Sequence, residues 1–91
     1  MNGNVYEGQW ARDKKLGKGV YTYYLTNEKY DGEFYENEKR GRGVFTYRFG
    51  DRYEGDFYSN LKSGKGTIFY KSGARFEGVW EKVSISKTLR I

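Results

Sequence analysis

The sequence predicts an all-β fold: a single-layer antiparallel sheet of successive β-hairpins, twisted into a ribbon. Three observations predict it. Rings dominate the apolar residues, since 20% of the chain is aromatic and only 36% is hydrophobic in total. A short pattern recurs four times, and within each copy residue types alternate with period two, as in a half-buried strand. The core of this chain of 91 residues therefore has to be built from aromatic side chains.

The first strand of each copy begins with an aromatic residue, an acidic residue and a glycine. Alternation places the rings and the glycine on one face of this strand. The four segments are Tyr6–Trp10, Tyr30–Phe34, Tyr53–Phe57 and Phe76–Trp80. Polar segments rich in turn-forming residues follow the first three, at 11–16, 35–40 and 58–63, and each is long enough to reverse the chain.

The second strand of each copy opens with a Gly-basic-Gly triplet and continues as an aromatic-rich run. The triplets are Gly17–Gly19, Gly41–Gly43 and Gly64–Gly66, and the runs are 20–24, 44–47 and 67–70. Short links centred on Asn27, Gly50 and Gly73 lead to the next copy. Each copy is therefore expected to be one hairpin, and successive hairpins to continue one twisted sheet.

This pattern resembles the MORN repeat, whose name abbreviates membrane occupation and recognition nexus. The resemblance covers residues 6–80, as copies at 6–29, 30–52 and 53–75 and a partial copy at 76–80, after a lead-in at 1–5. Where the family usually carries another glycine, this chain has Asp13, Asn37 and Asn60, which are the residues that best tolerate a left-handed backbone after glycine.

The resemblance implies a scaffold or protein-interaction module. In the family such repeats are attached to kinases, methyltransferases, junctional membrane proteins and cytoskeletal or ciliary scaffolds. For this chain we therefore expect a non-enzymatic module, which fits a subunit of a larger cytoskeletal or ciliary assembly. The alternative that the family name implies is a peripheral membrane module.

Glycines within strands indicate that something bulky approaches the backbone closely. We predict the register that sets each first-strand ring opposite a glycine of its own hairpin. The pairs are Trp10 with Gly19, Phe34 with Gly43 and Phe57 with Gly66. In this register Gly43→Val places a branched side chain under Phe34 and should cost several kcal/mol by overpacking.

Residues 81–91 depart from the repeat. Val83, Ile85, Leu89 and Ile91 alternate mainly with polar residues, which fits an eighth strand or an apolar cap that closes the last hairpin. The same segment fits a free edge for another chain. Because the first strand also lacks an evident cap, we expect either a partner over that edge or self-association.

The face of rings and glycines is the first candidate site. Its rings form the core of a protein poor in aliphatic residues, and they also fit a groove that accepts an apolar segment of a protein partner. The candidate groove residues are Trp10, Tyr21, Tyr23, Phe34, Phe45, Tyr47, Phe57 and Tyr70.

Basic residues recur at one phase of the repeat and form the second candidate site. Stacking predicts that they align along one edge, where they would contact anionic phospholipid headgroups. The eight cations are Lys14, Lys15, Lys18, Lys39, Arg40, Arg42, Lys62 and Lys65. The acidic residues of each first strand allow a simpler interpretation, a mixed and solvated surface.

The composition excludes most kinds of catalytic and metal-binding site. The chain has no histidine and no cysteine, which removes imidazole bases, thiol nucleophiles and Cys/His metal sites. We predict no catalytic residue, no metal and no cofactor. The net charge of +5 is modest and interleaved with acidic residues, which disfavours nucleic acid as a partner.

The expected location is cytoplasmic, in association with the cytoskeleton or on the cytosolic face of a membrane. No apolar run approaches the length of a membrane span, and the first residues lack the pattern of a signal peptide.

Overall fold

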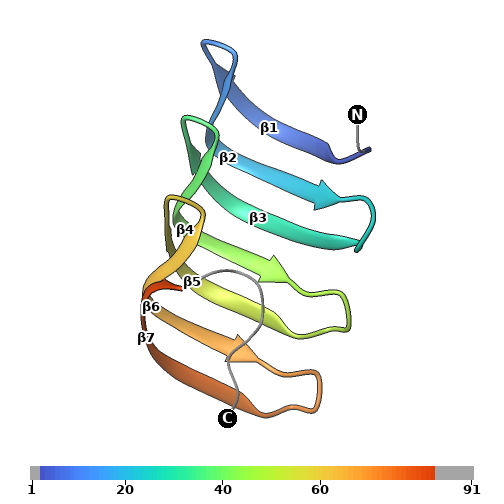
Figure 1. Ribbon diagram of the computed structural model, residues 1–91, viewed down its shortest axis with the longest axis vertical. Coiled ribbons are helices and arrows are strands. Elements are labelled where there is room, and N and C mark those ends of the chain that lie inside the picture. The colour runs from blue at the N-terminus through green and yellow to red at the C-terminus, as the bar shows by residue number, and fades with distance from the viewer. Residues whose placement is uncertain (1–2, 84–91) are drawn as a thin grey trace.

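The computed structural model describes residues 3–83, which form seven antiparallel strands in one open sheet without a helix (Figure 1). The strands are β1 (Val5–Ala11), β2 (Lys14–Tyr23), β3 (Glu28–Tyr35), β4 (Glu38–Thr46), β5 (Arg52–Tyr58), β6 (Leu61–Phe69) and β7 (Arg75–Val83). The sheet order follows the chain order, so every strand pairs only with its neighbours in sequence. The predicted fold class is confirmed.

The hairpin loops are shorter than predicted. Each contains two residues, both with positive φ, as in the type I′ turn that matches the twist of the flanking strands. These loops are Arg12 and Asp13, Glu36 and Asn37, and Ser59 and Asn60. The links between hairpins also turn where predicted, with positive φ at Asn27, Gly50 and Gly73.

The residues that replace the usual family glycine do more than tolerate a left-handed backbone. The side-chain oxygen of Asn37 accepts a hydrogen bond of 2.8 Å from the backbone N–H of Lys15, and the N–H of Asn37 donates to the carbonyl of Lys15 at 3.0 Å. Asn60 makes the same pair of bonds, with the same lengths, to the backbone of Lys39. The loop of one repeat is thereby bonded to the hairpin of the repeat before it.

The predicted register is wrong. Within each hairpin the glycines pair with each other, Gly8 with Gly19, Gly32 with Gly43 and Gly55 with Gly66, while Trp10, Phe34 and Phe57 lie opposite lysines. The cause is a bulge: between the glycine pair and the ring, the second strand carries more residues than the first. Within the bulge Gly17, Gly41 and Gly64 adopt positive φ, which favours glycine.

A ring does lie opposite a glycine, but across the boundary between repeats. Phe34 pairs with Gly17, Phe57 with Gly41 and Trp80 with Gly64, each time on the strand that precedes the ring. Seven glycines also follow one another across the sheet, Gly8, Gly19, Gly32, Gly43, Gly55, Gly66 and Gly78. This glycine row leaves a furrow of bare backbone on one face of the sheet.

The tyrosine that opens each full repeat fills this furrow. A Cβ added at Gly43 would lie 2.5 Å from ring atoms of Tyr30, so no side chain fits beneath that ring. The Tyr30 hydroxyl donates a hydrogen bond of 2.7 Å to the carbonyl of Glu33. Tyr6 and Tyr53 bond in the same way to the carbonyls of Gln9 and Asp56. Each tyrosine therefore lies along its own strand, over the glycine pair.

The rings over the furrow form a continuous edge-to-face stack, the arrangement that the ring quadrupole favours. Consecutive centroids lie 4.9–5.2 Å apart, with planes 83–90° from each other. The order is Trp10, Tyr6, Phe34, Tyr30, Phe57, Tyr53 and Trp80. We call the face that carries this stack the inner face and the opposite one the outer face.

Candidate functional site

The predicted groove residues all share the inner face, but half of them are core. Phe34, Phe45, Tyr47 and Phe57 are buried, whereas Tyr21, Tyr23 and Tyr70 are partly exposed. Trp10 is the open one, with 56% of its surface exposed. The role of these rings in binding a partner stays a prediction.

The rings that cover the glycines are the leading tyrosines, which were not among the predicted groove residues: Tyr6, Tyr30 and Tyr53. Tyr30 and Tyr53 are fully buried. A signal for them was present, because each stands two residues before a glycine on the same face of the strand. A ring at that position can lie along the strand onto the bare backbone.

Burial of the inner face is lost at one end of the sheet. The residues equivalent to Trp10 in later repeats, Phe34, Phe57 and Trp80, are only 3–5% exposed, because a glycine of the preceding strand lies opposite each. β1 is the first strand of the sheet and has no such neighbour among the described residues (Figure 1).

Four residues make up this open end of the inner face: Tyr6, Trp10, Lys15 and Tyr21. The ammonium of Lys15 lies 5.5 Å from the ring centroid of Tyr6, 5.7 Å from that of Trp10 and 5.3 Å from that of Tyr21. These distances are within the range of cation–π attraction. The open end thus combines one cation with exposed ring surface.

The predicted single edge of eight cations is wrong, because alternation along each second strand divides them between the faces. Lys15, Lys39 and Lys62 lie on the inner face among the rings, and Lys39 and Lys62 are only 7% and 1% exposed. The Lys39 ammonium donates a hydrogen bond of 2.6 Å to the Tyr23 hydroxyl. Burial, reinforced by the charge of Lys15, lowers the pKa of Lys39 to about 8.

The remaining cations lie on strands and belong to the outer face. Lys14, Lys18, Arg42 and Lys65 are exposed. Along one row of the outer face Lys18 pairs with Glu33 and Arg42 with Asp56, so that signs alternate across the strands. The Arg42 guanidinium lies 3.1 Å from an Asp56 carboxylate oxygen. This row matches the simpler interpretation, a mixed and solvated surface.

Arg40 is held by rings instead of carboxylates. Its guanidinium carbon lies 4.9 Å from the centroid of Tyr35 and 4.4 Å from that of Tyr58, the exposed tyrosines at the ends of β3 and β5. Arg40 therefore links the hairpins of the second and third repeats.

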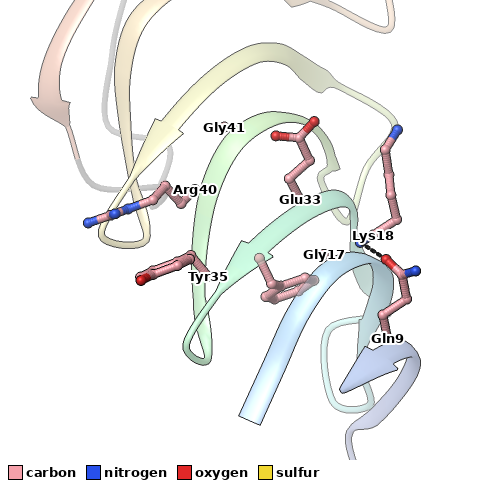
Figure 2. Close-up of a pocket in the computed structure, with 8 residues that line it drawn as sticks. Gln9, Gly17, Lys18, Glu33, Tyr35, Arg40 and Gly41 are labelled. Carbon is pink, nitrogen blue, oxygen red and sulfur yellow. Dashed lines mark hydrogen bonds between the residues drawn. The ribbon is translucent and has the colours of Figure 1, made fainter. Parts of the chain in front are cut away.

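A depression of 330 Å³ crosses β1 to β4 where the bulge glycines lack side chains (Figure 2). Figure 2 shows Gln9 bonded across the strands to the backbone of Lys18, and Glu33 beside Gly41. The Gln9 and Glu33 side chains accept hydrogen bonds from the backbone N–H groups of Lys18 and Arg42, at 2.7 and 3.3 Å. These groups hold the bulges in place, and the depression offers no nucleophile activated by a base.

Three consecutive units of this geometry are the decisive observation for the family. A model of the MORN repeat matches residues 6–24, 30–52 and 53–75, which make up more than half of the chain. The chain belongs to the MORN-repeat family. No curated protein matches it at a significant level.

The MORN repeat is a non-enzymatic repeat module. In the part of the chain that the structure describes, no three acidic, histidine or cysteine side chains are grouped to hold a metal ion. Among residues 3–83 there is also no helix with the length and apolar character needed to cross a bilayer.

The links between MORN repeats carry exposed apolar residues that the sequence analysis passed over. Tyr24, Leu25 and Phe49 are 68%, 82% and 75% exposed. Arg48 and Lys71 flank these tips, and their backbone N–H groups donate to the carboxylates of Glu28 and Asp51, which brings successive links together. The signal was the recurrence of apolar residues in polar turns. We call this region the link side; it lies at one end of the strands, opposite the hairpin loops (Figure 1).

Proposed function

We propose that this chain is a non-enzymatic MORN-repeat scaffold that binds a protein partner at the open end of its inner face. We place it in the cytoplasm, as a subunit of a cytoskeletal or ciliary assembly. The observation that carries the proposal is the exposure of Trp10, 56% against 3–5% for its equivalents in later repeats. Stacked repeats present an extended surface for binding, which suits a scaffold.

The chemistry of the open end supports a protein partner. Tryptophan and tyrosine are enriched where protein interfaces derive most of their affinity. Trp10, Tyr6 and Tyr21 offer ring surface with little conformational freedom to lose, and Lys15 adds a charge for orientation. Exposure of the apolar indole ring to water is also unfavourable in free energy, and a partner that covers the ring removes this penalty.

The test compares the proteins that co-purify with three forms of the chain, identified by mass spectrometry. We expect wild type and the matched outer-face variant Lys65→Ala to retain the same specific partner. Trp10→Ala should lose it, with a fall in recovery of about tenfold or more, the effect of losing a central tryptophan. Equal capture by Trp10→Ala, when circular dichroism shows it to be folded, would count against the proposal.

The link side favours a second candidate, a peripheral module on anionic membranes. Three apolar tips, Tyr24, Leu25 and Phe49, stand beside the cations Arg48 and Lys71. Apolar groups that enter the headgroup region, together with cations near anionic lipid, are the two contributions that bind peripheral proteins. The surface that would contact the membrane is therefore the link side, and not the predicted edge of eight cations.

Flotation with vesicles that contain phosphatidylserine tests this second candidate. We expect wild type and Trp10→Ala to float at low salt and to be released as salt rises, since screening weakens the cationic contribution. The variant Leu25→Ser with Phe49→Ser should remain unbound. Equal flotation with neutral vesicles would refute the contribution of anionic lipid, and flotation unaffected by the double substitution would refute a link-side membrane contact.

A further inference from the structure

Among residues 3–83, the outer edge of β1 lacks the neighbouring strand that every later first strand has. At the three boundaries between repeats, a second strand lies before a first strand: β2 before β3, β4 before β5 and β6 before β7. β1 is a first strand of the same kind, yet it stands at the end of the sheet order. Because no described strand pairs with this edge, its backbone N–H and C=O groups form a template for one more strand.

The boundaries also specify what the missing strand must carry. At each boundary the ring two residues after the first-strand glycine lies opposite a bulge glycine with positive φ, as Phe57 lies opposite Gly41 (φ 90°). Any side chain at that glycine would strain the backbone, since left-handed φ is unfavourable for other residues. The next glycine of the triplet pairs with the glycine of the first strand, Gly43 with Gly55; a Cβ added at Gly43 would collide with the ring of Tyr30 in β3, the strand on its other side.

We propose that the edge of β1 binds a Gly-basic-Gly strand supplied by another polypeptide, by β-strand addition. Superimposing the β4–β5 boundary on β1 sets the first glycine of the incoming strand opposite Trp10, the basic residue opposite Gln9 and the second glycine opposite Gly8. The aromatic residue two positions later falls opposite Tyr6. This inference rests on the proposed function, because it names the partner of the open end.

A basic residue opposite Gln9 continues the pattern of the outer face. The equivalent pairs are Lys18 with Glu33, Arg42 with Asp56 and Lys65 with Val79, so the basic position is kept at all three boundaries whereas the residue opposite it varies. A folded second copy of this chain does not offer such a strand among its described residues, since β2, β4 and β6 are each paired on both sides. The occupant is therefore a strand of this type that is free, such as the end of another repeat array.

The probe is a synthetic peptide with the sequence of residues 37–47, which spans β4 and contains no tryptophan. The receptor is the full chain with Trp80→Phe, a substitution that copies the residue present at Phe34 and Phe57. In this receptor Trp10 is the sole indole, so its emission and its quenching by acrylamide report on the β1 edge.

We expect the peptide to shift Trp10 emission to the blue and to reduce its quenching as exposure falls from 56% toward the 5% of Trp80, a change of roughly tenfold. Exchange of the amide hydrogens of β1 should slow in the same titration. A control peptide with Gly41→Val should leave both signals unchanged. The proposal is overturned if neither peptide affects Trp10, if both act equally, or if the peptide binds without any change at Trp10.

The two proposals fail in different ways. If the peptide has no effect while Trp10→Ala still abolishes capture of a protein partner, the scaffold function stands and the strand-addition inference falls. If the peptide protects Trp10 but capture does not depend on Trp10, the edge binds a strand and the proposed scaffold contact is wrong.

Discussion

Gly43→Val is expected to lower the free energy of unfolding by about 3 kcal/mol or more, the upper range for overpacking a core. A Cβ at this position would lie 2.5 Å from the ring of Tyr30, which is fully buried between Phe34 and Phe57 and has nowhere to move. The collision is with Tyr30, not with Phe34 as the sequence register had it. Urea unfolding followed by circular dichroism measures the loss.

Gly78→Val is the matched control. Gly78 belongs to the same glycine row but to a first strand, as the fourth-copy equivalent of Gly32, and the nearest atom to a Cβ added there is a ring carbon of Phe76 at 3.1 Å. Phe76 is partly exposed and can turn toward solvent, so we expect a loss below about 1 kcal/mol. Equal losses for the two variants would show that the tyrosine over the glycine pair is not what excludes side chains.

Lys39→Met is expected to raise the free energy of unfolding near neutral pH by about 2 kcal/mol, because it removes a buried charge whose desolvation opposes folding. The methionine keeps the length of the side chain against Tyr23 and Tyr30 and removes an ammonium that burial disfavours. The lost hydrogen bond to the Tyr23 hydroxyl costs less, since that tyrosine is only partly buried and can bond to water.

The same residue should impose a pH dependence on the wild-type protein. In the unfolded chain Lys39 titrates near its ordinary value of 10.5, whereas in the fold its pKa is about 8. Between these values the unfolded state holds the proton and the folded state does not, so stability rises with pH. Below pH 8 both states are protonated, and the cost of burying the charge is constant.

At higher pH the tyrosines reverse the trend. Burial, with the nearby Tyr21 and Glu28, raises the pKa of Tyr23 from 10.0 to about 12. From pH 10 upward the unfolded state therefore loses a proton that the folded state keeps, and stability falls. Wild-type stability should peak near pH 10.

Urea unfolding at about pH 7, about pH 9.5 and about pH 11 checks the profile. Lys39→Met should lose the rise between the first two values and keep the fall above them. The exposed outer-face variant Lys65→Met should keep both. A rise that persists in Lys39→Met would assign it to another group.

The regular features of the fold were predictable because they depend on residue type and spacing. The four copies of the pattern predicted the seven strands, and Asn27, Gly50 and Gly73 marked the links between hairpins. The register was not predictable by the same means. Counting residues assumes an uninterrupted strand, and the bulge at Gly17 appears only when contacts such as the hydrogen bond from the Lys18 backbone N–H to the Gln9 side-chain oxygen are known.

The site was predicted less well than the fold, for two reasons. Lysine is rarely buried, so Lys39 and Lys62 were expected at the surface, whereas the fold buries them. Each lies an even number of residues before the inner-face glycines of its strand, which alternation places on the same face. The exposure of a ring such as Trp10 depends on whether another strand lies beside it, and alternation within one strand carries no information about that.

Because each described strand pairs in the sheet only with its chain neighbours, the length of the molecule is set by the number of repeats. Each copy advances the sheet by two strand spacings, about 9.6 Å, without altering the copies already present. Removing residues 30–52 would join Lys29 to Tyr53, which restores the basic-aromatic junction found at Lys29 and Tyr30. The number of units thus sets the distance between whatever the two ends hold, independently of the chemistry at either end.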